Sequence, residues 1–264
     1  FKWPDSFFKG SWQFRTTQNK YFSSIVEDLT GYFGNIDALI TNNNGVSEFQ
    51  TSGRSITQII NRDNRNHPEF PTEGSLFTWT SILSGSFIGG DEDYHKHVFD
   101  FKWFTPFVSK FTMQQIIKVG AIKSIPVFGN QRSIIPPSAR FLLGGSGIPY
   151  GEMLRGYPDN SVGSGNNYYN RGGNIIVKYG LEFRLLFSEN PTIYGLTFFE
   201  AGNVWQDFEQ IDTFDLNRSA GIGVRLFMPM LGMLGYDVGY GFDKDLSIPN
   251  SSPWEYHLIF GMPF

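Results

Sequence analysis

Apolar and polar residues alternate with a period of two along much of this chain. In the clearest segment, Tyr179, Leu181, Phe183, Leu185 and Phe187 alternate with Lys178, Gly180, Glu182 and Arg184. Successive side chains of a β-strand point to opposite faces of the sheet, so this spacing predicts a strand with one apolar face. A helix is excluded, because Gly and Pro recur and the apolar residues are not spaced three and four apart.

The same alternation recurs along the chain. It predicts strands around 8–15, 99–103, 117–121, 220–226, 234–242 and 256–264, with weaker candidates near 54–62, 75–87 and 139–145. The segment Thr192–Trp205 is apolar on both faces, so its orientation stays open. The total is about eleven strands of roughly nine to thirteen residues, and a tilted strand needs about 9–11 residues to cross a bilayer.

The predicted connections alternate between short and long. Residues 105–109, 188–191 and 229–232 form tight turns, whereas 23–52, 124–138, 146–172, 206–217 and 244–254 are long and rich in Asn, Gly, Ser and Asp. Short turns on one side and long loops on the other are typical of an outer-membrane barrel.

Composition also favours a membrane barrel, and a soluble β-sandwich, which would show the same alternation, stays the alternative. Aromatic residues make up 17% of the chain, and charged residues also reach 17%, below the roughly 25% of an ordinary soluble domain. Mean hydropathy is −0.23, and no apolar run approaches the ~18 residues of a membrane helix. These values favour an all-β transmembrane antiparallel β-barrel, in which apolar and polar positions cancel in the average.

Charge and cysteine content exclude several classes of function. The formal net charge of −4 is too balanced for a nucleic-acid binder. The chain has no Cys, which removes thiol catalysis, disulfides and cysteine metal sites.

Large aromatic residues recur near the ends of the predicted strands. In a barrel they would form interfacial girdles, and in a soluble sheet they would be core residues. The residues concerned are Trp79, Trp103, Tyr179, Trp205 and Trp254.

An odd number of strands conflicts with a closed bacterial barrel, which normally has an even number. An unpaired edge in lipid is costly because its backbone groups stay unsatisfied. The chain also starts at Phe1 without an initiator Met. We therefore expect the C-terminal part of a larger barrel.

Several segments occur in an order and spacing that resemble the BamA family of outer-membrane assembly factors, the POTRA-barrel proteins of the outer-membrane insertase superfamily. The resemblance covers roughly residues 52–264. Its segments are Phe70–Ser75, Met153-Leu154-Arg155-Gly156-Tyr157, Gly173-Asn174, Leu181-Glu182-Phe183, Phe199–Trp205, Arg218–Arg225 and the terminal Phe264, three residues after Gly261.

The resemblance implies a barrel of roughly sixteen strands, of which residues 1–264 supply about the last eleven. The first strands and the periplasmic POTRA repeats would be absent from this sequence. Residues 146–172 would form a loop inserted into the lumen.

The resemblance also assigns the tip of that loop. Arg155, Gly156 and Tyr157 would form its lumen motif, with Arg155 held by the inward carboxylates Glu182 and Glu200. An Arg fork can bind carboxylates bidentately, which suits pinning a long loop. The alternative is a solvated loop arginine.

Two other constellations suggest chemistry that we do not expect. Glu182 and Glu200 could be paired acid and base groups, but a lumen arginine explains them. His95 and His97 share a strand face, yet no third metal ligand is evident. We therefore expect no enzyme, no metal site and no cofactor.

The last predicted strand carries the implied mechanism. Gly261 weakens a strand interior, and Pro263 removes a backbone donor. In the family this strand borders a lateral seam that can open into the membrane. The seam and insertion signal would comprise Tyr256, Leu258, Phe260, Gly261 and Phe264; a frayed end without a role is the alternative.

The resemblance implies assembly of other barrel proteins in the outer membrane of a Gram-negative bacterium. The implied partners are unfolded outer-membrane β-barrel proteins, periplasmic-side lipoproteins of the assembly complex, periplasmic chaperones and outer-membrane lipid. The alternatives are a TamA-like or polypeptide-translocating relative and a passive porin or uptake channel.

Overall fold

The computed structural model describes residues 5–24, 29–30, 33, 40–108, 110–126, 134–147, 150–163, 172–212, 214–247 and 251–261. Its strands are β1 (Phe8–Ser23), β2 (Thr41–Asn43), β3 (Val46–Asp63), β4 (Gly74–Ser84), β5 (Tyr94–Val108), β6 (Phe111–Ser124), β7 (Ile175–Glu189), β8 (Thr192–Trp205), β9 (Asn217–Met228), β10 (Gly232–Gly241) and β11 (Trp254–Gly261). The described residues also include three short 3-10 helices, η2 (Ser86–Ile88), η3 (Pro137–Ala139) and η4 (Phe208–Gln210). Among the described residues, no helix has the length and apolar character to cross a membrane.

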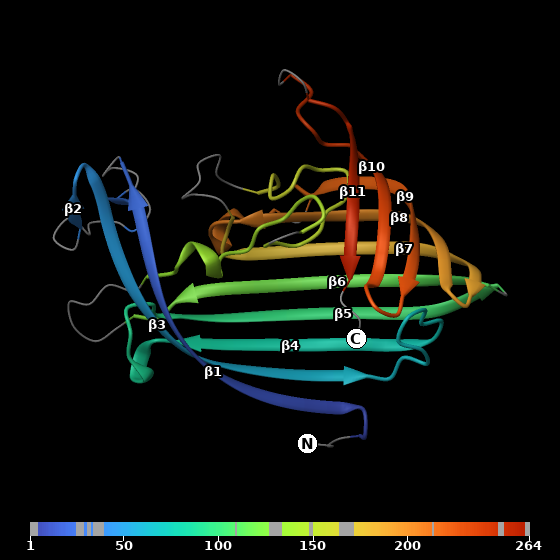
Figure 1. The fold of residues 1–264 in the computed structure, drawn as a ribbon, viewed down its shortest axis with the longest axis horizontal. Helices are drawn as coiled ribbons and strands as arrows, with labels where there is room; N and C mark the ends of the chain where they lie inside the picture. Colours follow the sequence, from blue (N-terminus) through green and yellow to red (C-terminus); the bar gives the residue numbers. More distant parts are fainter. Residues whose placement is uncertain are drawn as a thin grey trace.

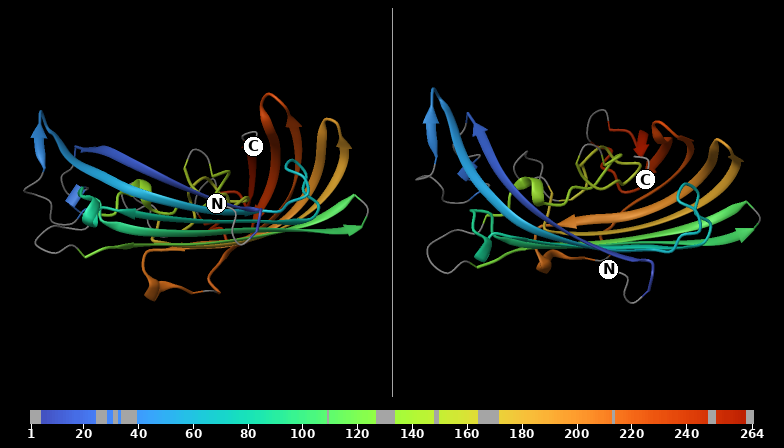
Figure 2. Two further views of the ribbon diagram at one scale, coloured as in Figure 1. Left: turned by 90° about the horizontal axis from the view of Figure 1, so that it is seen from below. Right: turned by 60° about the horizontal axis from the view of Figure 1, so that its bottom comes forward.

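The strands form one eleven-stranded antiparallel sheet, in the order β1-β3-β4-β5-β6-β7-β8-β9-β10-β11 with β2 beside β3. The predicted all-β antiparallel architecture is therefore confirmed. Within the described residues the sheet is open, because β1 and β11 stand at opposite ends of this order. Figures 1 and 2 show that the sheet curls strongly and that the loop between β6 and β7 lies on its concave side.

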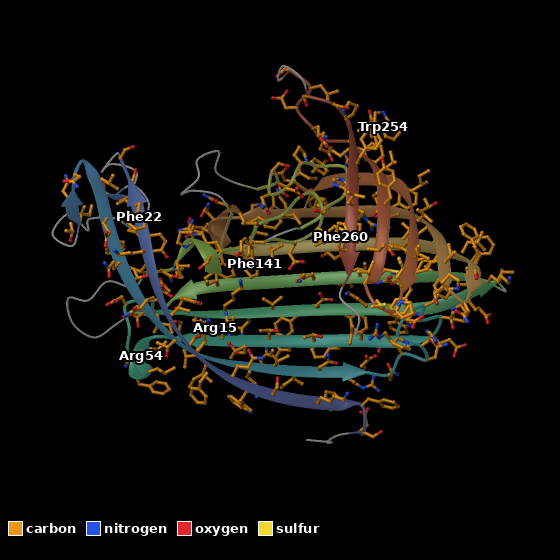
Figure 3. All side chains as sticks on the ribbon, viewed as in Figure 1. Arg15, Phe22, Arg54, Phe141, Trp254 and Phe260 are labelled. Carbon is orange, nitrogen blue, oxygen red and sulfur yellow. The ribbon has the colours of Figure 1, made fainter. Side chains whose placement is uncertain are left out.

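The alternation of β7 separates the two faces of the sheet as the sequence predicts. Tyr179, Phe183 and Phe187 are 45%, 37% and 57% exposed, whereas Lys178 and Glu182 are each 4% exposed. Aromatic residues of β11 follow the same rule: Trp254 and Phe260, labelled towards the two ends of that strand in Figure 3, are 50% and 63% exposed. The convex face is therefore apolar, as a lipid-facing surface requires.

Connections alternate between short and long around the sheet. The β7–β8 turn is Asn190 and Pro191, and the β9–β10 turn spans 229–231. The connections from β6 to β7, β8 to β9 and β10 to β11 span 125–174, 206–216 and 242–253. The predicted arrangement of tight turns at one edge and long loops at the other is present.

Several sequence-based boundaries are wrong. The predicted tight turn 105–109 overlaps β5, which runs to Val108. The predicted strand near 75–87 is shorter, because β4 ends at Ser84. The predicted strand near 139–145 is instead part of the β6–β7 loop, with isolated bridges at Phe141, Leu143 and Gly145. Its apolar side chains alternate because they pack against the sheet beneath. The predicted loop 23–52 contains β2 and the start of β3, since β3 runs from Val46 and buries Phe49.

The predicted girdle aromatics do not all behave alike. Trp103, Tyr179 and Trp254 are 53%, 45% and 50% exposed, and the ring of Trp79 stacks on Phe99 at 5.7 Å. Trp205 departs from the prediction with 5% exposure, because it ends β8 opposite the buried Ile175.

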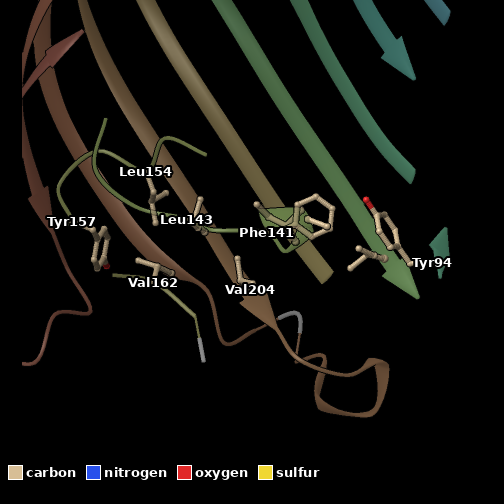
Figure 4. Packing of buried hydrophobic residues seen from close by; sticks show 10 residues of the cluster. Tyr94, Phe141, Leu143, Leu154, Tyr157, Val162 and Val204 are labelled. Atoms are coloured by element: carbon tan, nitrogen blue, oxygen red, sulfur yellow. The ribbon is translucent and has the colours of Figure 1, made fainter. Parts of the chain in front are cut away.

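The largest hydrophobic core lies between the loop and the concave face, as Figure 4 shows. Loop residues contribute Phe141, Leu143, Leu154, Tyr157 and Val162. The sheet contributes Tyr94 of β5, Ile122 of β6, Ile176 of β7 and Val204 of β8. This core holds the loop inside the curve of the sheet.

Candidate functional site on the concave face

The β6–β7 loop is fastened to the sheet at its base. Phe141 and Gly173 exchange two backbone hydrogen bonds of 2.9 Å, which brings the two arms of the loop together. The ammonium of Lys118 on β6 lies 2.5 Å from the Glu152 carboxylate. Apolar packing and one ion pair thus carry the described part of the loop towards β9 and β10.

The tip of the loop needs glycine on both sides of the contact. Gly156 has φ +87, a left-handed conformation that favours glycine. A Cβ there would lie 3.0 Å from the Ser219 Cβ and from the Tyr240 carbonyl carbon. On β10, a Cβ at Gly239 or Gly241 would meet Gly156 backbone atoms at 2.6 Å. The absence of side chains therefore lets the tip lie directly on the strand.

Arg155 is fully buried and contacts three carboxylates from three strands. Its Nη2 lies 2.7 Å from Glu182 Oε1 on β7 and 2.8 Å from Glu200 Oε1 on β8. Its Nη1 lies 3.3 Å from Asp237 Oδ2 on β10. The guanidinium carbon also lies 3.8 Å from the ring centroid of Phe198. We call Arg155, Glu182, Glu200 and Asp237 the clasp.

The backbone of Arg155 adds a further bond, since its N–H donates to Glu200 Oε2 at 2.8 Å. Glu200 therefore holds both the main chain and the side chain of the same residue. The clasp fixes the position of the tip as well as neutralising its charge.

Each clasp carboxylate has a second cationic partner on the sheet. Arg184 donates to Glu182 at 2.7 and 2.9 Å, and Arg225 donates to Asp237 at 2.5 and 2.7 Å. Lys178 lies 3.3 Å from Glu200. Together with Arg155 these make four cations against three carboxylates. Buried ions are tolerated when paired and hydrogen-bonded in this way.

Tyr157 anchors the tip of the loop at a second point, beyond the clasp. Its hydroxyl donates to the Arg218 carbonyl at 2.9 Å and accepts from the Asp243 N–H at 3.3 Å. The side chain is buried, and burial raises the pKa of Tyr157 to about 12. Its ring belongs to the loop core, so the hydroxyl anchors an otherwise apolar contact.

Of the residues that the sequence singles out, the structure brings together Arg155, Gly156, Tyr157, Glu182 and Glu200. The candidate seam residues lie elsewhere: Tyr256, Leu258 and Phe260 are 65%, 60% and 63% exposed on the convex face of β11. Gly261 pairs with Met233 at the end of that strand, and Phe264 lies outside the described residues.

Sequence reasoning missed five polar neighbours of the loop tip. They are Lys178, Arg184, Arg225, Asp237 and His257, all on the concave face. The signal was present, because each lies at a polar position of an alternating strand. The pattern gives the face of a residue but not the distant chain segment that it contacts.

The described residues offer little for acid-base or metal chemistry. Glu182 and Glu200 each contact two cations, so neither carboxylate is free to act as an acid or base. His95 and His97 share a face with ring centroids 5.5 Å apart. Within the part of the chain that the structure describes, no group of three His, Cys, Asp or Glu side chains could hold a metal ion.

The chain is similar to known proteins over most of its length. A family model described as the Omp85 superfamily domain matches residues 6–253. The outer membrane protein assembly factor BamA of Nitratidesulfovibrio vulgaris is 25% identical over 205 residues, which are 74% of this chain and 24% of that protein. The crystal structure of BamA from Haemophilus ducreyi lacking POTRA domains 1-3 is similar with a TM-score of 0.71 and 19% identity, over 96% of this chain and 51% of that chain. The chain thus spans about a quarter of the first protein and about half of the second.

Proposed function

Because the chain belongs to the Omp85 superfamily, we propose that it forms the C-terminal part of the barrel of an outer-membrane assembly factor. The whole protein folds other β-barrel proteins and inserts them through a lateral seam beside β11. It is a protein of the outer membrane of a Gram-negative bacterium. Its action is non-covalent, since it accelerates strand pairing and insertion and transforms no substrate.

The observation that carries this proposal is the clasp. Arg155 meets Glu182, Glu200 and Asp237 with its side chain fully buried. In this proposal residues 146–172 are the lumen-inserted loop, and Arg155, Gly156 and Tyr157 are its functional tip. The clasp ties β7, β8 and β10 to one point, which supports a rigid wall next to the strand that must move.

The seam follows from the contrast between β11 and that wall. Among the residues that the structure describes, β11 spans eight residues, whereas β7 spans fifteen. Fewer backbone hydrogen bonds hold a shorter strand to its neighbour across the seam, so fewer must break when the seam opens. A released strand exposes an unpaired edge, to which an incoming strand can add by β-augmentation. Tyr256, Leu258 and Phe260 would then face lipid while the strand edge receives the substrate.

The partners follow from the same proposal. Unfolded outer-membrane β-barrel proteins arrive with periplasmic chaperones, and lipoproteins of the assembly complex bind on the periplasmic side. The convex aromatic face contacts outer-membrane lipid.

Depletion of the protein in its own host tests the role. We expect outer-membrane porins to accumulate unfolded, as seen in the loss of their heat-modifiable folded band. A passive porin would instead conduct ions steadily in planar bilayers, and its loss would leave other porins folded. A TamA-like relative would differ in the number of POTRA repeats of the full-length protein.

A further inference from the structure

The tip of the loop is bonded to the terminal strand as well as to the clasp. The N–H of Gly156 donates to Nε2 of His257 on β11 at 3.0 Å. The His257 side chain is 6% exposed, and its Cα partner across the β10–β11 ladder is Asp237 of the clasp. One buried hydrogen bond therefore joins two segments that lie 101 residues apart.

The chemistry of this bond is specific. Nε2 can accept a hydrogen bond only when it carries no proton, so His257 is neutral with its proton on Nδ1. The facing carboxylate of Asp237 is bound by Arg225 and Arg155 through both oxygens. Nε2 of the imidazole is therefore available to accept the hydrogen bond from the Gly156 N–H.

The donor is equally constrained. Arg155, which precedes Gly156, is held by the clasp, and a Cβ at Gly239 would lie 2.6 Å from the Gly156 nitrogen. The Gly156 amide therefore lies directly against the backbone of β10. Loss of the imidazole acceptor therefore leaves a buried N–H unpaired, which costs more than the bond itself contributes.

We propose that His257 is a positioning residue that couples the seated loop tip to β11. While the tip is seated, β11 is held beside β10, and release of either one loosens the other. Such coupling is reciprocal by thermodynamic necessity. The inference rests on the proposed function, in which β11 borders the seam, and it names what keeps that strand in place.

An ion pair on β11 supplies a matched control. Lys244 lies 2.8 Å from Glu255, so this pair also fastens β11 to the chain that follows β10. Within the described part of the chain, neither side chain of this pair hydrogen-bonds to Arg155 or Gly156. Glu255→Gln therefore perturbs the same strand without touching the tip.

The first experiment measures hydrogen-deuterium exchange of the full-length protein in lipid nanodiscs, in peptides covering 150–160 and β11. We expect His257→Leu to speed exchange at the Gly156 amide by about five- to a hundredfold, the equivalent of leaving one buried N–H without its acceptor. His257→Gln, whose carbonyl can accept the bond, should restore protection. Glu255→Gln should leave the tip unchanged.

Two results would overturn the coupling. One is protection of the tip in His257→Leu equal to that of the parent protein. The other is exchange in His257→Gln as fast as in His257→Leu, because packing and not the acceptor would then hold the tip.

A second experiment tests reciprocity with a reversible lock. The chain has no Cys, and Val238 and Tyr256 are Cα partners across β10 and β11, so cysteines there can be bridged. We expect oxidation to slow exchange at the tip when His257 is present and to leave it unchanged in His257→Leu. Equal slowing in both backgrounds contradicts the proposal.

These readouts are independent of the assembly role. If depletion leaves porins folded while exchange shows the coupling, the proposed function fails and the coupling stands. If porins accumulate unfolded while exchange is unaffected by His257→Leu, the coupling fails alone.

Discussion

Arg155 and Asp237 lie 82 residues apart in sequence, yet Nη1 of the arginine is 3.3 Å from Oδ2 of the aspartate, with both side chains fully buried. The same carboxylate is bound by Arg225 on the neighbouring strand. One aspartate thus connects the loop to the pairing of β9 and β10. A change at the clasp should therefore affect both the stability of the loop and the pairing of β9 with β10.

Arg155→Ala should release the loop while the sheet remains inserted. The substitution removes the one cation that contacts all three buried carboxylates, and breaking a buried pair typically costs about 3–5 kcal/mol. Limited proteolysis between 134 and 163 should become much faster than in the parent protein. Equal protease sensitivity of the loop would argue against the clasp.

Glu182→Gln should destabilise the site through charge excess. Glu182 contacts both Arg155 and Arg184, so its neutralisation leaves these two cations facing each other. The double variant Glu182→Gln/Arg184→Gln should recover part of the loss, because one charge of each sign is removed. The temperature at which the folded band disappears in semi-native electrophoresis measures both. Additive losses would contradict the network.

Gly156→Ala should unseat the tip. The residue has φ +87, and a Cβ would lie 3.0 Å from two β-sheet atoms. Strain and contact together should cost more than the roughly 1 kcal/mol of an ordinary Gly change. Gly10→Ala is the control, since nothing lies within 4 Å of its added Cβ. The same thermal assay should show a loss for the first variant and none for the second.

Tyr157→Phe should weaken the attachment of the loop tip while the aromatic ring stays packed. The ring stays in the core, but the bond to the Arg218 carbonyl is lost, at a cost of about 1 kcal/mol. Tyr150→Phe is the control, because Tyr150 is 77% exposed. Faster exchange at the tip in the first variant alone is the expected result.

Tyr157 should also make the attachment of the loop weaker at alkaline pH. Its pKa is raised from 10.0 to about 12 by burial, so the folded protein holds the proton more tightly than the unfolded chain. This stabilisation is complete below pH 10 and is lost as the pH rises from 10 towards 12. A pH titration of loop proteolysis should show this loss in the parent protein and a smaller one in Tyr157→Phe.

The sequence was sufficient for the architecture because a period of two specifies a strand and its buried face. It correctly assigned the apolar face of β7. It failed at 139–145, where Phe141 and Leu143 alternate although they belong to a loop. Apolar side chains two residues apart occur in a strand, but they also occur in a loop that lies flat on a sheet and packs against it.

The clasp could be predicted only in part. Resemblance to a family suggested Arg155, Glu182 and Glu200, because these lie in recognisable motifs. Asp237 and His257 lie in strands whose pattern shows the face but gives no information on long-range contacts. Such contacts depend on the curvature of the sheet and on the path of the loop.

A crosslink between β11 and a substrate during assembly would test insertion beside this strand. A photoreactive residue replaces Leu258 in the full-length protein, and a porin is stalled by slowing its folding in cells. We expect a crosslink to a terminal strand of the porin that disappears once the porin has folded. Efficient porin assembly with no crosslink from any position between 256 and 260 would contradict insertion beside this strand.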